Sequence, residues 1–253
     1  MSIYKHVSGN GPTLVLLHGW GTSSAVWKNL IPLLATRFQV IAIDLPGFGQ
    51  SEWDSNIDSL ALLSEAILAI LPENSIFLGW SLGGLIAQYI AIHHPHRVSS
   101  LISVTSTPCF IDKSDWPGIH EFLLNKFAED LKIDYQKTLT RFFTLMQFAA
   151  PSPDKNLIKF LSETLIEHPP KIEALEFGLN LLLHTDLRSE LYKIQCPMKF
   201  ILGQLDTIVP ARIAEPLQQL APEVSIEILP KSSHAPFLSD PENFLTATGL
   251  INE

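Results

Sequence analysis

A serine between two glycines is the residue of this chain best suited to nucleophilic chemistry. Ser81 is the centre of the pentapeptide GWSLG at residues 79–83, between a predicted buried strand at 76–78 and a predicted apolar helix at 85–92. A serine on so sharp a turn needs neighbours without bulk two positions to either side, and glycines stand at both. The pattern predicts a serine nucleophile, with the backbone N–H of Leu82 at a helix N-terminus as an oxyanion donor.

The serine needs a base and a carboxylate, and candidates for both follow late predicted strands. A hydroxyl is a poor nucleophile at neutral pH, so it requires an imidazole whose tautomer is fixed by a carboxylate. Asp206 follows a predicted strand at 198–202, and His234 follows one at 225–229. Each also fits an ordinary loop role, as a turn-capping aspartate or a surface histidine. The order serine, aspartate, histidine matches a known chain order of catalytic triads.

A second oxyanion donor is expected in the loop after the first buried strand, residues 13–17. That loop reads HGWG at residues 18–21, and its glycines let the backbone approach a ligand closely. The backbone N–H of Trp20 is expected to border the nucleophile turn and to join that of Leu82. The indoles of Trp20 and Trp80 are expected to line an acyl pocket, with a plain core role as the alternative for each.

Other reactive residue types in the chain have simpler explanations. His18 and Asp44 are predicted to support loops rather than to transfer protons. A histidine cluster follows the helix after Ser81 without a carboxylate at metal-ligand spacing, so it predicts a solvated helix end. The cysteines are too few for a disulfide framework and are predicted to be buried. We therefore expect no metal and no cofactor. The clustered histidines are His93, His94 and His96, and the cysteines are Cys109 and Cys196.

Composition places the chain among globular proteins. It has 253 residues, of which 46% are hydrophobic and 17% charged, enough for one large core. The net charge of −9 disfavours nucleic acids and anionic membranes, because the field of the whole molecule repels phosphates. The N-terminal residues lack an apolar signal region, and no apolar run approaches the length of a membrane span. We therefore expect a cytoplasmic protein, and a monomer.

Predicted strands and helices alternate along the chain, which is typical of a mostly parallel sheet with helices on both faces. No strand is convincing between residues 111 and 187, where prolines separate helical segments, so we predict an α/β core with an inserted helical cap. Ser24 is the expected N-cap of the first helix. The expected ranges are 24–34, 40–43, 59–71, 98–104 and 241–250, and the expected divisions are 1–110 (core), 111–187 (cap or lid) and 188–253 (core).

Six sequence runs carry a resemblance to known proteins. They are LHGWG at 17–21, DLPGFGQS at 44–51, GWSLGG at 79–84, PCF at 108–110, DWPGI at 115–119 and HAPF at 234–237. Together they resemble the α/β-hydrolase superfamily over nearly the whole chain. Within it, Trp80 and the DWPGI run make the chain similar to the family of pimeloyl-[acyl-carrier-protein] methyl ester esterases.

This resemblance implies a serine carboxylesterase of biotin synthesis, which hydrolyses the methyl ester of a pimeloyl chain on acyl carrier protein and releases methanol. It also implies that basic cap residues bind the carrier; where the family has mostly arginines, this chain has three lysines and one arginine. The implied site residues are Ser81 (nucleophile), His234 (base), Asp206 (orienting carboxylate), Trp20 and Leu82 (oxyanion donors), Trp20, Trp80, Leu82, Phe142, Phe143 and Met146 (substrate contacts), and Lys137, Arg141, Lys155 and Lys159 (carrier contacts).

Three other functions stay open on the sequence alone. A broad short-chain carboxylesterase or thioesterase would use the same triad on small free esters. A hydrolase of carbon–carbon bonds in aromatic-ring degradation products would use it on another substrate class. A non-catalytic ligand receptor on the same scaffold is disfavoured, because Ser81, Asp206 and His234 are all present.

Overall fold

A mostly parallel sheet forms the centre of the molecule. The structure is a computed structural model that describes residues 1–147 and 155–251. Within them one seven-stranded sheet has the order β1-β3-β2-β4-β5-β6-β7, in which β1 is antiparallel to β3 and the other neighbours are parallel. The strands are β1 (Lys5–Ser8), β2 (Thr13–Leu17), β3 (Gln39–Ile43), β4 (Ser75–Trp80), β5 (Val98–Val104), β6 (Met198–Gly203) and β7 (Ser225–Leu229).

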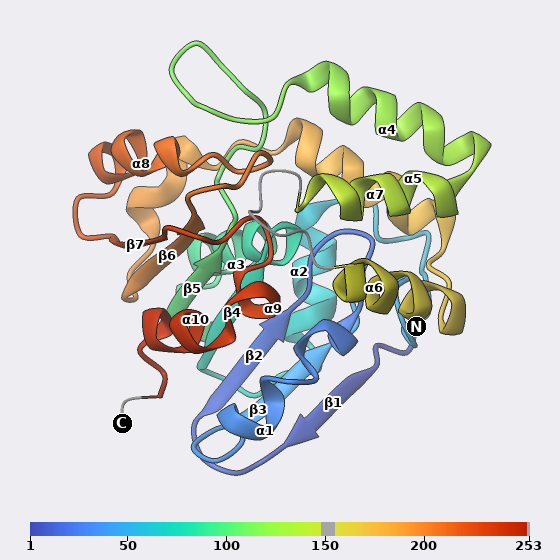
Figure 1. Ribbon diagram of the computed structural model, residues 1–253. Helices are drawn as coiled ribbons and strands as arrows, with labels where there is room; N and C mark the ends of the chain where they lie inside the picture. Colours follow the sequence, from blue (N-terminus) through green and yellow to red (C-terminus); the bar gives the residue numbers. More distant parts are fainter. Residues whose placement is uncertain (148–154, 252–253) are drawn as a thin grey trace.

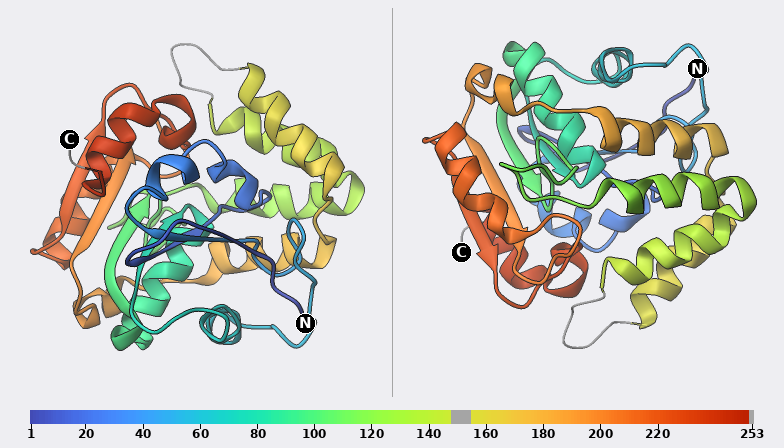
Figure 2. Two further views of the ribbon diagram at one scale, coloured as in Figure 1. Left: turned by 90° about the horizontal axis from the view of Figure 1, so that it is seen from below. Right: turned by 90° about the horizontal axis from the view of Figure 1, so that it is seen from above.

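Helices cover both faces of this sheet (Figure 2). On one face lie α1 (Ile31–Leu34) and α10 (Pro241–Thr248), and on the other lie α2 (Leu60–Leu68) and α3 (Leu82–His93). The central strands are therefore continuous apolar runs, and residues 14–17 of β2 are fully buried. The arrangement confirms the predicted fold class. Other helical elements of the core are η1 (Ser24–Trp27), η2 (Pro95–Arg97), η3 (Arg188–Lys193), η4 (Ala211–Ile213), α8 (Ala214–Leu220) and α9 (Pro236–Ser239).

The sheet brings the carboxyl ends of its parallel strands to one edge. Ser81 follows β4 directly, Asp206 lies in the loop after β6, and His234 lies in the loop after β7. Strand β5 separates β4 from β6 in the sheet. Loops at this edge carry the functional residues of open α/β sheets, so the topology alone places the three side chains in one region.

The predicted helix over residues 24–34 is wrong. The segment forms the 3-10 turn η1 and, after an interruption, the short helix α1. Pro32 has no N–H to donate to the carbonyl four residues earlier, so a continuous helix through this segment would lack a hydrogen bond. The N-cap also differs from the expected Ser24, because the side chain of Ser23 accepts the backbone N–H of Ala25 at 3.4 Å.

Between β5 and β6, four of the helices that the structure describes form a cap on the right-hand side of Figure 1. Helix α5 packs on α4 and α6, and α4 packs on α7. The segment leaves and re-enters the core at one place, where Cys109 and Asp186 form an antiparallel bridge. Its limits at residues 111 and 187 stay a prediction. The cap helices are α4 (Glu121–Ile133), α5 (Tyr135–Leu145), α6 (Lys155–Glu167) and α7 (Ile172–His184).

Candidate active site

Ser81 lies on a strained turn between β4 and α3. Its backbone angles are φ 54° and ψ −117°, and conformations of this kind cost on the order of 1–3 kcal/mol in a residue with a side chain. The turn requires both glycines, because a Cβ on Gly79 would overlap the carbonyl of Gly83, and a Cβ on Gly83 would overlap that of Leu17. The backbone N–H of Ser81 donates to the carbonyl of Val104 at 3.0 Å, which ties the turn to β5.

Ser81, His234 and Asp206 form one buried chain of hydrogen bonds. Nε2 of His234 lies 2.9 Å from Oγ of Ser81, and Nδ1 lies 2.8 Å from Oδ2 of Asp206. The other carboxylate oxygen, Oδ1, accepts the backbone N–H groups of Ile208 at 2.8 Å and Val209 at 3.1 Å. Because an ionised carboxylate can only accept, Nδ1 carries the ring proton and Nε2 turns a lone pair toward the serine hydroxyl.

The backbone of His234 is fixed by residues from three other segments. Its carbonyl accepts the indole N–H of Trp80 at 2.7 Å and the hydroxyl of Thr105 at 2.6 Å. Its N–H donates to the carbonyl of Met146 at 3.3 Å, and Ser233 Oγ donates to the same carbonyl at 2.7 Å. The C-terminus of cap helix α5 thus contacts the histidine loop directly. The sequence pattern gives no sign of Thr105 or Ser233, because a hydroxyl directed at a backbone carbonyl carries no motif.

Both tryptophans of the predicted acyl pocket are almost fully buried and use their indole N–H groups in the protein itself. The indole of Trp80 packs on Phe237 with ring centroids 5.1 Å apart, in addition to its bond with the histidine loop. The indole of Trp20 donates to the carbonyl of Leu175 in α7 at 2.9 Å and packs edge-on against Phe142 at 4.9 Å. These contacts explain the burial of both rings, while their contact with an acyl chain stays a prediction.

Two backbone N–H groups meet one requirement of the predicted oxyanion role, because they have no acceptor among the described residues. Among the hydrogen bonds of the described residues, neither the N–H of Trp20 nor that of Leu82 donates to a protein acceptor. Leu82 begins α3, so its N–H also lies at the positive end of the helix dipole. The loop that carries Trp20 is held by His18, whose Nδ1 lies 2.8 Å from the carbonyl of Gly19.

His18 is a buried, neutral support for this loop. Its Nε2 accepts the backbone N–H of Leu45 at 2.9 Å, so the proton is on Nδ1. Burial lowers the pKa of His18 below its usual value, and the nearby carboxylate of Asp44 opposes this shift in part. Asp44 itself accepts the backbone N–H groups of Ser24 at 2.7 Å and Gln50 at 2.8 Å. Both residues therefore connect loops, as the sequence predicts.

The apolar cap residues expected at the substrate lie at the end of α5, and one of them contacts Trp20. Phe142 and Phe143 belong to α5, Met146 is its C-cap, and all three are almost fully buried. The ring of Phe142 sits between two aromatic neighbours, Trp20 at 4.9 Å and Phe127 at 5.8 Å. The end of α5 therefore joins the cap, the predicted oxyanion loop and, through the carbonyl of Met146, the histidine loop.

The expected carrier-binding cations have mixed surroundings. Lys137 and Arg141 lie in α5 and are exposed. The guanidinium of Arg141 pairs with Asp130 at 2.6 Å, and Lys159 pairs with Glu163 at 3.7 Å. Lys155 is the first residue of α6, and its side chain lies outside the described residues. Asp130 and Glu163 thus offset two of the four expected cations, so the surface is less positive than these four residues alone suggest.

The other reactive residues do not form a second chemical site. Nε2 of His93 lies 3.7 Å from a carboxylate oxygen of Glu190, and Nε2 of His94 lies 3.6 Å from one of Glu65. In the part of the chain that the structure describes, no group of three His, Cys, Asp or Glu side chains could hold a metal. Burial raises the pKa of both Cys109 and Cys196, which makes these thiols less reactive. Among the same residues, no helix has the length and apolar character to cross a membrane.

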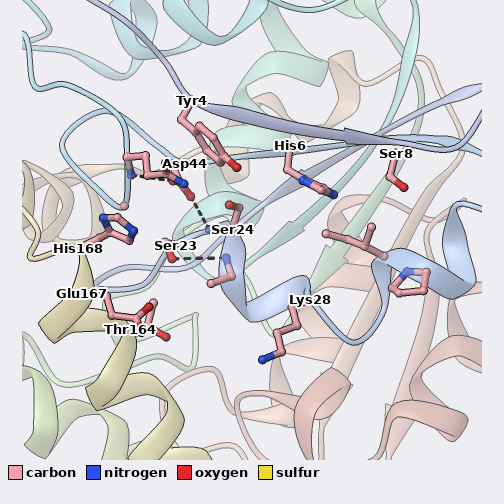
Figure 3. A pocket seen from close by; sticks show the side chains of 15 residues that line it. Tyr4, His6, Ser8, Ser23, Ser24, Lys28, Asp44, Thr164, Glu167 and His168 are labelled. Carbon is pink, nitrogen blue, oxygen red and sulfur yellow. Dashed lines mark hydrogen bonds between the residues drawn. The ribbon is translucent and has the colours of Figure 1, made fainter.

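A separate pocket of about 500 Å³ lies between β1, the segment 23–32 and α6 (Figure 3). Tyr4, His6 and Lys28 are among its lining residues, and the residues of the serine chain are not. Its buried carboxylate, Asp44, is directed at the backbone N–H of Ser24, as the dashed line in Figure 3 shows. Polar and charged side chains line much of this pocket, and no nucleophile with a base beside it is found among its lining residues.

The geometry around Ser81 therefore suits nucleophilic acyl transfer. It combines a hydroxyl, an imidazole within hydrogen-bonding distance and a carboxylate behind the imidazole.

Comparisons with known proteins agree with this chemistry. A sequence family described as "alpha/beta hydrolase fold" matches residues 12–241. The chain is 42% identical over 247 residues to the pimeloyl-[acyl-carrier protein] methyl ester esterase of Aeromonas hydrophila, covering 97% of each protein. It is 40% identical over 245 residues to the protein of that name in Vibrio cholerae, covering 96% of this chain and 95% of the relative. An esterase structure from Exiguobacterium antarcticum superposes with a TM-score of 0.89 at 24% identity, covering 98% of this chain and 95% of the other. The chain thus belongs to the α/β-hydrolase family and, within it, to the group of pimeloyl-[acyl-carrier protein] methyl ester esterases.

Proposed function

We propose that this protein is a serine carboxylesterase that hydrolyses the methyl ester of a pimeloyl group carried on acyl carrier protein, as a step of biotin synthesis. The observation that carries the proposal is the buried hydrogen-bonded chain from Asp206 through His234 to Ser81. It occurs in a sequence that matches methyl ester esterases over 97% of its length. An ester hydrolase needs this chain of groups, whereas a ligand receptor does not.

The first half of the proposed reaction transfers the acyl group to the enzyme. Nε2 of His234 removes the hydroxyl proton of Ser81 while Oγ attacks the ester carbonyl carbon. The negative charge moves to the carbonyl oxygen, where the N–H groups of Trp20 and Leu82 stabilise it. Loss of one such donor costs about 3–4 kcal/mol in comparable sites. The tetrahedral intermediate then expels methoxide, which takes the proton from His234 and leaves as methanol.

The second half returns the enzyme to its starting state. His234 removes a proton from water, and the resulting hydroxide attacks the acyl carbon bound to Ser81. The same two N–H groups hold the new oxyanion. When the intermediate collapses, Oγ takes back the proton from Nε2, and the product leaves with a free terminal carboxylate. Asp206 stays ionised throughout and keeps the imidazole in the productive tautomer.

The end of α5 is the proposed contact for the acyl chain. Phe142, Phe143 and Met146 are apolar and almost fully buried, and Phe142 contacts Trp20, whose N–H is a proposed oxyanion donor. A linear chain of methylene groups gains about 0.8 kcal/mol for each CH₂ removed from water. An apolar surface beside the oxyanion donors therefore favours a long unbranched acyl group over a short one.

Carrier binding is proposed for the basic residues of α5 and α6. Acyl carrier proteins are recognised through acidic surfaces, and Lys137 is an exposed cation at the start of α5. Arg141 and Lys159 hold carboxylates of the cap itself, but exposed ion pairs of this kind contribute only about 0–1 kcal/mol. Each can therefore exchange its partner for a carboxylate of the carrier at small cost. Lys155 completes the proposed set.

A direct test compares two substrates with one reacting group. The purified protein would be given methyl pimeloyl thioester on acyl carrier protein and, separately, dimethyl pimelate, and methanol release would be followed. We expect a much higher kcat/KM for the carrier-bound ester and no release by Ser81→Ala from either. A higher kcat/KM for the free diester would refute the carrier-bound substrate and leave a general esterase. Activity in Ser81→Ala would refute the serine mechanism.

The carrier-binding residues are tested by charge reversal. Changing Lys137, Arg141, Lys155 and Lys159 together to Glu should raise KM for the carrier-bound ester at least about tenfold, equivalent to about 1.4 kcal/mol. Turnover of dimethyl pimelate should barely change. Lys193→Glu is the matched control, because Lys193 is an exposed, paired cation in η3 of the core. Equal losses on both substrates would show damage to the cap, and an unchanged KM would refute this binding surface.

A further inference from the structure

Two consecutive hydroxyl groups at the end of β5 contact the backbones of both reacting residues. Thr105 Oγ1 donates to the carbonyl of His234 at 2.6 Å, and Ser106 Oγ donates to the carbonyl of Ser81 at 2.7 Å. Thr105 and Ser106 are completely buried. The serine turn follows β4 and the histidine loop follows β7, so these hydroxyls connect two segments that are 153 positions apart in the chain.

The backbone of Thr105 is strained. Its φ is 39°, a value that a β-branched residue rarely adopts. The conformation is held by its N–H, which donates to the carbonyl of Ile201 in β6 at 2.7 Å, and by the hydroxyl bond to His234. Strain of this kind persists where the surrounding structure enforces it, and it concentrates at functional sites. Here it lies directly after β5, the neighbour in the sheet of β4, which leads into Ser81.

A further hydrogen bond lies beside each of these two contacts. Ser106 Oγ accepts the side-chain amide of Gln88 at 3.4 Å, so it is held from α3 while it donates to Ser81. The carbonyl that Thr105 contacts also accepts the indole of Trp80 at 2.7 Å. The carbonyl of Ser81 also accepts the backbone N–H groups of Gly84 at 3.0 Å and Leu85 at 3.1 Å. Both carbonyls therefore accept several hydrogen bonds in buried surroundings, where a hydrogen bond is stronger than in water.

We propose that Thr105 and Ser106 are positioning residues that set the distance between Ser81 Oγ and His234 Nε2. The proposal rests on the proposed serine mechanism. Asp206 fixes the imidazole at Nδ1 only, and the two hydroxyls fix the backbones from which the imidazole and the nucleophile project. A displacement of about 1 Å in such a pair lowers the rate of the chemical step by about a hundredfold. The hydroxyls therefore act on kcat rather than on substrate binding.

The test separates the hydroxyl of Thr105 from its shape. Thr105→Val keeps the branched side chain and removes the O–H, whereas Thr105→Ser keeps the O–H. With a p-nitrophenyl ester, Thr105→Val and Ser106→Ala should each lower kcat about 10- to 100-fold at unchanged KM. Thr105→Ser should recover most of the wild-type kcat. Thr107→Val is the matched control, because Thr107 is a buried neighbour whose hydroxyl donates to the carbonyl of Cys109 at 2.9 Å. It should keep the wild-type kcat.

Thermal melting accompanies each variant, so that unfolding is not mistaken for lost positioning. Wild-type kcat in Thr105→Val, or equal losses in Thr105→Val and Thr105→Ser, would overturn the role of that hydroxyl. If Thr105→Val does not fold, Ser106→Ala decides, since a selective loss of kcat supports the proposal and a wild-type kcat overturns it. An inactive Ser81→Ala beside a fully active Ser106→Ala would refute the positioning role alone. An active Ser81→Ala would refute the serine mechanism itself.

Discussion

Replacing Asp206 with asparagine changes the hydrogen-bonding character of the buried chain at one atom. Oδ1 of Asp206 accepts the backbone N–H groups of Ile208 and Val209. An asparagine keeps these two bonds only when its carbonyl oxygen faces them, which turns its NH₂ group toward Nδ1 of His234. Nδ1 must then accept, so the ring proton moves to Nε2. In that tautomer the imidazole cannot take the proton of Ser81.

The expected loss in kcat for Asp206→Asn is about four orders of magnitude, as for this change in other triads. At about 1.36 kcal/mol for each factor of ten, the barrier rises by about 5.4 kcal/mol. The opposite orientation of the asparagine amide is unfavourable, because it would set the NH₂ group against the N–H groups of residues 208 and 209. Each buried donor left unsatisfied costs about 1–3 kcal/mol. KM should change little, since Asp206 acts on the substrate only through His234.

The assay measures kcat and KM with a p-nitrophenyl ester, and circular dichroism gives the melting temperature. Asp44→Asn is the matched control, because Asp44 is also buried and also accepts two backbone N–H groups, from Ser24 and Gln50. The segments that Asp44 joins follow β2 and β3 and carry none of the three residues of the serine chain. This control should melt earlier yet keep kcat within about tenfold of the wild type. The reasoning fails if Asp206→Asn retains a tenth of the wild-type kcat, or if both variants lose kcat equally.

Ser81→Ala should lower esterase kcat by about a millionfold, as loss of the nucleophile does in serine hydrolases, with an unchanged melting temperature; residual turnover near wild type would move the nucleophile elsewhere. Gly83→Ala should lower the free energy of unfolding by about 3 kcal/mol, measured by urea denaturation, because its Cβ would overlap the backbone of residues 17 and 18; a neutral effect would mean that the turn can relax. Burial lowers the pKa of His18 in the folded state, so the unfolded chain takes up a proton at a higher pH than the folded protein does. The folded state is therefore most stable, with respect to His18, above pH about 6.5, and this stability is lost as pH falls through the lowered folded value. The melting temperature should therefore drop on acidification, and less so in His18→Gln; equal slopes would contradict this role.

The fold and the three residues of the serine chain could be predicted because both depend on local patterns. Apolar runs followed by polar loops mark the buried parallel strands, and the carboxyl ends of those strands meet at one edge. Ser81, Asp206 and His234 each follow such a run. The order of the strands in the sheet brings them close together, so no particular contact had to be predicted. Strand β1 escaped prediction because its residues are mostly exposed and show no apolar alternation.

The surroundings of these residues could not be predicted, because they depend on contacts between distant segments. Nothing in the sequence connects Thr105 to a carbonyl 129 positions away. The charge of the cap surface was equally out of reach, since Asp130 neutralises Arg141 across a helix boundary. Trp80 shows the same limit. Its type is visible in the motif, but its bond to the histidine loop is not.

The two ends of the cap segment meet at the surface of the core, so the cap and the core can change in sequence separately. Cys109 and Asp186 are bridged, the N–H of Leu187 donates to the carbonyl of Pro108 at 2.9 Å, and Arg188 joins Asp186 to Asp115. A segment that starts and finishes where these ends meet, and that again offers an acceptor to the N–H of His234, can replace the cap without altering the course of the sheet. Substrate preference can therefore diverge by exchange of the segment between these ends, while the nucleophile, the base and their sheet are inherited unchanged.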